Sequence, residues 1–150
     1  MWKALDEGVA SSSPVIITAG GARQLIVWTG SSVTSLNTAT GTVHWRERMT
    51  TSSNESVTTP AVQGSRLLIS GLMMELDPAK PAAKVLCPQN LVGTKRILSH
   101  TCTPVLRGDY IYGARSNGEL VCLDAATGRQ IWEEKKVTTL RKGSAIHLTP

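Results

Sequence analysis

The chain of 150 residues carries a net charge of +5, from 16 basic and 11 acidic side chains. A nucleic-acid-binding face needs a stripe of basic residues interleaved with aromatic rings. Here the basic residues are scattered, Phe is absent and two Tyr occur, so we expect no nucleic-acid partner. No apolar run approaches the roughly 18 residues of a transmembrane helix, and the N-terminus lacks a signal-peptide pattern. Three cysteines without CxxC spacing (Cys87, Cys102 and Cys122) argue against a disulfide framework.

Short strands separated by turns are expected along the whole chain, in three complete groups of four. The first group, at residues 12–49, has strands at 14–18, 24–28, 32–36 and 43–48. The second, at 58–88, has strands at 59–62, 66–70, 72–76 and 84–86. The third, at 102–136, has strands at 103–106, 110–114, 119–123 and 130–134. Partial groups are expected at 1–5, with Met1–Lys3 as a last strand, and at 143–150, with 144–149 as a first strand.

A repeat connects these groups. Leu36–Trp45 (LNTATGTVHW) and Leu123–Trp132 (LDAATGRQIW) share Leu, Thr-Gly and Trp at the same spacing, 87 residues apart. Trp2 precedes Trp45 by 43 residues, and Leu76–Cys87 (LDPAKPAAKVLC) is a degraded middle copy with Cys87 in the Trp position. A period of about 40–45 residues is the size of a four-stranded propeller blade. The sequence therefore predicts an all-β chain of about three and a half blades, a partial β-propeller.

Each recurring feature of the repeat has a structural interpretation. Leu points inward at the end of a third strand, Gly adopts the positive φ of a tight turn, and Thr hydrogen-bonds within that turn. Trp on the fourth strand places its ring between neighbouring blades. The predicted structural motif comprises Trp2, Leu36, Thr40, Gly41, Trp45, Leu76, Cys87, Leu123, Thr127, Gly128 and Trp132.

This motif resembles the tryptophan-docking motif of the propeller repeats of pyrroloquinoline-quinone (PQQ) enzymes. Asp124 fits the acidic position before the turn, Asn37 is a mild variant, and the Thr59-Pro60 and Thr103-Pro104 openings also fit. The string GDYIYGARSNGELVCLDAATGRQIWE resembles the non-enzymatic branch, which is similar to outer-membrane-assembly propeller lipoproteins. The resemblance implies that the parent family is periplasmic or exported, and it does not locate this chain.

The resemblance does not imply a cofactor. Quinoprotein dehydrogenases use an Asp base, a calcium held by Glu and Asn, and a vicinal disulfide, but this chain has no adjacent cysteines and pairs Glu with Asn only at Asn54-Glu55. We expect no cofactor, no metal site and no catalytic activity. His100 with Cys102 as metal ligands, and Asp109 with Tyr110 as an acid–base pair, are weighed against ordinary turn and strand roles, which we favour. His44 is expected at an exposed edge, His147 in the partial last blade, and the sequon Asn54-Glu55-Ser56 in a loop.

Two functions remain open at this point. One is a protein-interaction scaffold, and the other is a domain that binds a small ligand or quinone in a central channel. The first strands are mostly Val, Ile, Leu and small residues, which favours the scaffold. An open arc also exposes strand edges, so we expect either a fragment of a longer protein or a homodimer in which two arcs form a ring of about seven blades.

Overall fold

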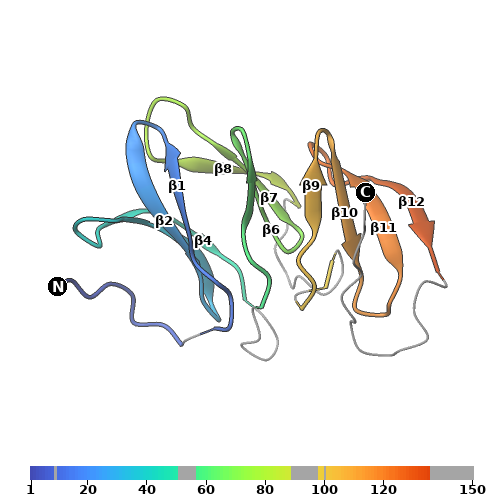
Figure 1. Cartoon of the computed structure of the whole chain (residues 1–150), viewed down its shortest axis with the longest axis horizontal. Helices are drawn as coiled ribbons and strands as arrows, with labels where there is room; N and C mark the ends of the chain where they lie inside the picture. The colour runs from blue at the N-terminus through green and yellow to red at the C-terminus, as the bar shows by residue number, and fades with distance from the viewer. Residues whose placement is uncertain (9, 51–56, 89–97, 100, 136–150) are drawn as a thin grey trace.

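In the computed structural model, which describes residues 1–8, 10–50, 57–88, 98–99 and 101–135, the described regular structure is entirely β. The strands form three antiparallel sheets of four, which we call blades 1, 2 and 3 (Figure 1). The predicted all-β propeller architecture is confirmed.

The strands of each blade follow chain order across the sheet. Blade 1 consists of β1 (Val15–Ala19), β2 (Ala22–Trp28), β3 (Ser32–Asn37) and β4 (Val43–Arg48). Blade 2 consists of β5 (Ala61–Gln63), β6 (Arg66–Ile69), β7 (Leu72–Leu76) and β8 (Ala83–Cys87). Blade 3 consists of β9 (Val105–Arg107), β10 (Tyr110–Ala114), β11 (Leu120–Asp124) and β12 (Gln130–Glu134).

The register between the third and fourth strands shifts by one residue at the same place in every blade. The last pair before the shift is Ser35 with Trp45 in blade 1, Met73 with Cys87 in blade 2, and Cys122 with Trp132 in blade 3. Such a bulge re-aims the side chain beside it. Trp45, Cys87 and Trp132 therefore occupy equivalent positions in their blades.

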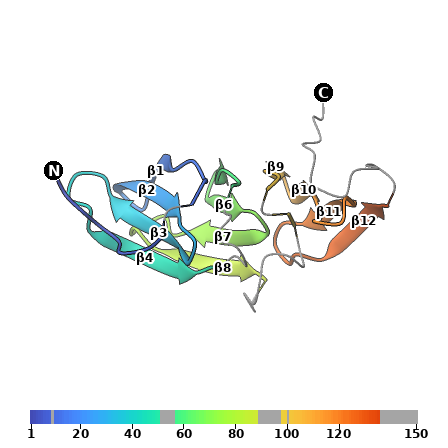
Figure 2. The same cartoon turned by 90° about the horizontal axis from the view of Figure 1, so that it is seen from below.

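Two apolar cores join the blades in series. The first lies between blades 1 and 2 and includes Ile26, Trp28, Val33, Leu67, Ile69 and Met74. The second lies between blades 2 and 3 and includes Leu68, Met73, Cys87, Leu98, Ile111 and Val121. In Figure 2 the blades stand side by side, with their first strands along one edge of the molecule and their fourth strands along the other. The blades therefore form an arc in which blade 2 lies between the other two.

The N-terminal segment differs from the sequence-based expectation. Residues 1–8 contain no strand, so the prediction that Met1–Lys3 forms the last strand of a blade is wrong. A fourth strand requires a third strand for hydrogen bonding, and the described residues offer none to this segment. The strand predicted at 144–149 lies outside the described residues.

Candidate functional site

The turn between β3 and β4 forms a slot that holds the indole ring of Trp2. Gly41 has a φ of +75°, and its N–H donates to the Asn37 carbonyl at 2.9 Å. Asn37 Oδ1 accepts two further backbone N–H groups of the turn. The indole lies on Gly41, where a Cβ atom would collide with the ring, and Trp2 Nε1 donates to the Thr38 carbonyl at 3.3 Å. Both the backbone conformation and the ring therefore require glycine here.

The turn between β11 and β12 has the same construction, but it receives a cysteine. Gly128 has a φ of +71°, and Asp124 Oδ1 accepts the N–H of Thr127 at 2.8 Å and its hydroxyl at 2.7 Å. These hydrogen bonds from Thr127 hold the pKa of the Asp124 carboxyl below its usual value. A Cβ built on Gly128 would lie 3.2 Å from Cys87 Sγ, and that thiol lies 3.8 Å from the Ala125 carbonyl oxygen. Cys87 thus contacts the blade 3 turn as Trp2 contacts the blade 1 turn.

The buried thiols have little nucleophilic character. Burial, with a smaller contribution from the charge of Asp124, raises the pKa of Cys87. Burial also raises the pKa of Cys122. The thiolate is the reactive form of cysteine, so both groups stay protonated near neutral pH and serve as packing residues.

The corresponding turn of blade 2 lacks the Thr-Gly pair. Asp77 Oδ1 accepts the N–H groups of Ala79 and Lys80 at 2.8 and 3.2 Å, so the start of the turn is retained. The Lys80 carbonyl lies so close to Gly20 of blade 1 that a Cβ on Gly20 would overlap it. An open groove of about 520 Å³ lies beside this turn, lined by Ser65, Glu75, Leu76, Asp77, Lys80 and Lys84.

Trp45 lies between blades 1 and 2 and is anchored by a buried amide. Its indole Nε1 donates to Gln24 Oε1 at 3.1 Å, and the Ser35 hydroxyl donates to the same oxygen at 2.6 Å. The Gln24 Nε2 donates to the Ala19 carbonyl at 2.8 Å. Gln24 is fully buried, so these bonds compensate the cost of removing its amide from water. This anchoring role of Gln24 was not predicted from the sequence. A single polar residue in the otherwise apolar run QLIVW could have indicated a buried hydrogen-bonding group.

The other motif residues lie at the ends of the third strands and in the turns. Leu36, Leu76 and Leu123 are buried. Thr40 is exposed, and its hydroxyl lies 2.9 Å from that of Thr42.

The outer face of blade 3, directed away from blade 2, presents aromatic side chains. One row across the sheet contains Val105, Tyr112, Cys122 and Trp132. The Tyr112 ring lies 6.3 Å from Trp132 and 6.5 Å from Tyr110. Trp132 is 40% exposed, Tyr110 44% and Val105 48%. The motif predicted that the Trp132 ring would lie between two blades; in the described residues it contacts its own blade and remains partly exposed.

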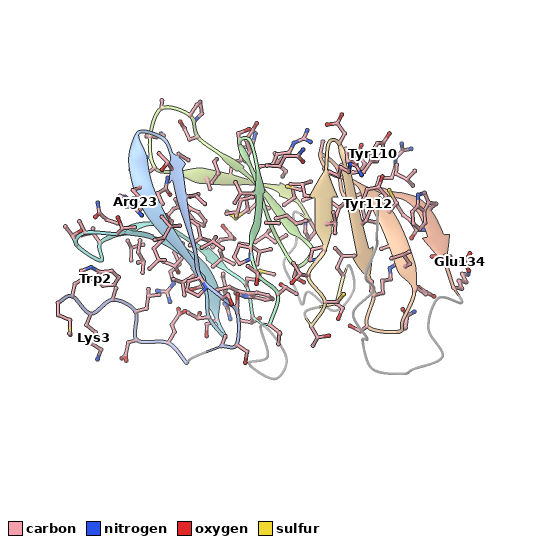
Figure 3. All side chains as sticks on the ribbon, in the orientation of Figure 1. Trp2, Lys3, Arg23, Tyr110, Tyr112 and Glu134 are labelled. Atoms are coloured by element: carbon pink, nitrogen blue, oxygen red, sulfur yellow. The ribbon has the colours of Figure 1, made fainter. Side chains whose placement is uncertain are left out.

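The outer face of blade 1 is instead partly covered by the N-terminal segment, and Ile16 and Val43 on this face stay exposed. Glu7 accepts hydrogen bonds from the hydroxyls of Thr29 and Ser32 and forms an ion pair with Arg46. Ser32 Oγ also accepts the Arg46 Nε–H at 3.1 Å. An open cavity of about 350 Å³ is lined by Glu7, Ser31, Ser32, Arg46 and Arg48. Figure 3 shows Trp2 and Lys3 at this end of the arc and Tyr110, Tyr112 and Glu134 at the other.

The residues that the sequence offered as candidates for acid–base chemistry or metal binding lie at separate places in the structure. Asp109 is exposed, and its carboxylate pairs across the blade junction with Arg66 at 2.9 Å. His44 is half-buried on β4, and Cys102 is a half-buried free thiol. His100, His147 and the sequon Asn54-Glu55-Ser56 lie outside the described residues. Within the part that the structure describes, no three His, Cys, Asp or Glu side chains are grouped as metal ligands, and no helix capable of crossing a membrane occurs.

Solved structures share this fold. BamB from Moraxella catarrhalis aligns with a TM-score of 0.62 and 18% identity, over 91% of this chain and 40% of that chain. The quinohemoprotein alcohol dehydrogenase ADHIIG from Pseudomonas putida HK5 aligns with a TM-score of 0.54 and 15% identity, over 88% of this chain and 22% of that one. A europium-containing methanol dehydrogenase aligns with a TM-score of 0.51 and 14% identity, over 80% of this chain and 23% of that chain. This chain therefore spans two fifths or less of these relatives.

The sequence itself also has a family match. No curated protein matches the chain. The family described as outer membrane protein assembly factor BamB matches residues 1–148, nearly the whole sequence. The chain therefore belongs to this BamB family of PQQ-like β-propeller proteins.

Proposed function

We propose that this chain is a non-catalytic scaffold that binds proteins through the sheet faces at the two ends of its arc. The outer face of blade 3 carries this proposal, because Val105, Tyr110 and Trp132 are each at least 40% exposed on one sheet. Aromatic residues on an exposed, contiguous apolar face are typical of protein–protein contacts. The family description as an assembly factor supports a protein partner and an exported location.

The chemical state of the motif residues also favours a scaffold. Asn37, Asp77 and Asp124 use their side-chain oxygens to hold the turns of their own blades. The thiols of Cys87 and Cys122 are buried and protonated. These groups therefore stabilise the blades and are not directed toward a ligand.

We further propose that the arc self-associates. Its two ends present different sheet faces, and the first strands β1, β5 and β9 each leave one edge unpaired within the described sheets. Two arcs of three described blades each would supply six blades, within the range of closed propellers. A homodimer would thereby protect the edges that a single arc leaves open.

Sedimentation velocity over a range of micromolar concentrations tests the self-association. We expect a concentration-dependent dimer, whereas a monomer that unfolds cooperatively at every concentration would contradict it. Titration with pyrroloquinoline quinone and calcium, followed by absorbance, tests the scaffold. A saturable quinone spectrum would instead support the second candidate, a quinone- or ligand-binding domain, for which the shared fold of the dehydrogenases is the specific observation.

A further inference from the structure

The two ends of the arc are covered to different extents. On blade 1, Trp2 occupies the slot at Gly41, and Glu7 contacts Thr29 and Ser32. Residues 1–8 make these contacts without joining the sheet. On blade 3, the row with Tyr112 and Trp132 has no blade beyond it within the described residues. Among the described residues, therefore, one docking slot is filled by the N-terminal segment and one docking tryptophan lies in no slot.

The slot that fits Trp132 is defined by the contacts inside the molecule. Trp132 has the same register as Cys87, and Cys87 contacts the turn glycine of the next blade. The Trp132 ring thus requires a turn of the same kind, with room for an indole. The Gly41 turn of blade 1 has that room, because Trp2 already lies in it.

The outer face of blade 1 carries an excess of positive charge, although Arg46 is already paired with Glu7, and the outer face of blade 3 carries a small excess of negative charge. Arg23, Arg46 and Arg48 alternate with inward-facing neighbours on β2 and β4, so they belong to the outer face of blade 1. The outer face of blade 3 carries Glu134 in the row on one side of Trp132, and Asp124 with Arg107 in the row on the other side. Blade 2 separates these two faces within one chain, so their contact requires a second copy (Figure 2).

We propose that the outer face of blade 3 docks on the blade 1 slot of a second copy, with Trp132 taking the place of Trp2. Residues 1–8 then act as a competing occupant that restrains association, because Trp2 must leave Gly41 before the incoming ring enters. This inference rests on the proposed self-association and specifies its two surfaces and its regulation.

Three full-length variants test the proposal by sedimentation equilibrium. Trp132→Ala weakens association by about tenfold or more, as loss of a buried interface tryptophan does. Val62→Ala is the control, because Val62 is 42% exposed on β5 of blade 2, outside both proposed surfaces, and it changes association by less than about threefold. Trp2→Ala strengthens association severalfold, because it empties the slot. Circular dichroism checks that each variant is folded, and Tyr110→Ser replaces Trp132→Ala if the latter is not.

The outcomes separate this inference from the proposed function. If wild-type protein associates and Trp132→Ala equals Val62→Ala, self-association stands and the assigned surface is wrong. If Trp2→Ala weakens association, Trp2 belongs to the interface and the competition is overturned. If N-bromosuccinimide fails to oxidise Trp132 in dilute monomer, the chain itself covers this face, which also overturns the inference. If no variant associates, self-association itself fails.

Discussion

The junctions on either side of blade 2 use the same register with different chemistry. Between blades 1 and 2 the position at the bulge is Trp45, whose indole is hydrogen-bonded to the buried Gln24 amide. Between blades 2 and 3 the same position is Cys87, whose sulfur contacts Gly128 and faces the Ala125 carbonyl. The bulge and the turn therefore set the docking geometry, and the size of the docking side chain varies within it.

The junction with the smaller side chain has additional polar contacts at its rim. Arg66 pairs with Asp109 and donates to the Gly108 carbonyl, both at 2.9 Å. The Thr59 N–H donates to the Thr103 hydroxyl at 3.3 Å. An exposed ion pair contributes at most about 1 kcal/mol, less than the burial of a tryptophan. We therefore expect the junction built on Trp45 to be the more stable of the two.

The largest expected effect distinguishes Trp45 from Trp132. Trp45→Ala lowers the free energy of unfolding by about 3 kcal/mol, because it removes an interblade ring and leaves a gap. Trp132→Ala lowers it by about 1 kcal/mol in dilute monomer, because that ring contacts mainly Tyr112 and is partly exposed. Urea denaturation followed by circular dichroism measures both values. Equal losses would show that the position in the repeat, rather than the neighbouring blade, determines the contribution.

The second prediction isolates the polar anchor of the first junction. Gln24→Met keeps the side-chain length but removes the oxygen that accepts from Trp45 and Ser35. The buried Ser35 hydroxyl and the half-buried Trp45 indole N–H then lack this acceptor, so the free energy of unfolding falls by about 2 kcal/mol. Gln63→Met on the exposed end of β5 is the control and changes little. Denaturation curves in which the two variants coincide would contradict the anchoring role of Gln24.

The third prediction compares two glycines with positive φ. Gly108 has a φ of +58° and open space where a Cβ would lie, whereas a Cβ on Gly128 meets Cys87 at 3.2 Å. Gly108→Ala lowers the stability by about 1 kcal/mol through backbone strain alone. Gly128→Ala loses about 1 kcal/mol more, because the added methyl also presses on the second junction. Thermal and urea unfolding measure the stability loss of each variant. Equal losses would mean that Cys87 moves aside for the added methyl group at little cost in free energy.

The smallest effect concerns the turn carboxylate of blade 3. Hydrogen bonds from Thr127 lower the pKa of Asp124 in the folded state. The contribution of this carboxylate to the free energy of unfolding is therefore present above its unfolded pKa of about 3.9, and it is lost as the pH falls through the folded pKa. Asp124→Asn keeps the acceptor oxygen, as Asn37 does in blade 1. We expect near wild-type stability at neutral pH and a weaker loss of stability in acid. An unchanged acid profile, measured by denaturation across the pH range, would assign the effect to other carboxylates.

The sequence by itself determined the blades. The repeated Leu, Thr-Gly and Trp positions predicted four-stranded units, the turns and the equivalence of Cys87 with the tryptophans, and the structure places these residues at one register. The reason is that these features are local: strand alternation and a glycine at positive φ depend on neighbouring residues.

Contacts between blades were decided only by the tertiary structure. The burial of Gln24 against Trp45, the pairing of Asp109 with Arg66, and the exposure of Trp132 all depend on which surface faces a given side chain. The unpaired course of residues 1–8 has the same origin, since a strand forms only where another strand accepts its hydrogen bonds. Local patterns specify backbone conformation, whereas burial and pairing require a partner that the pattern does not identify.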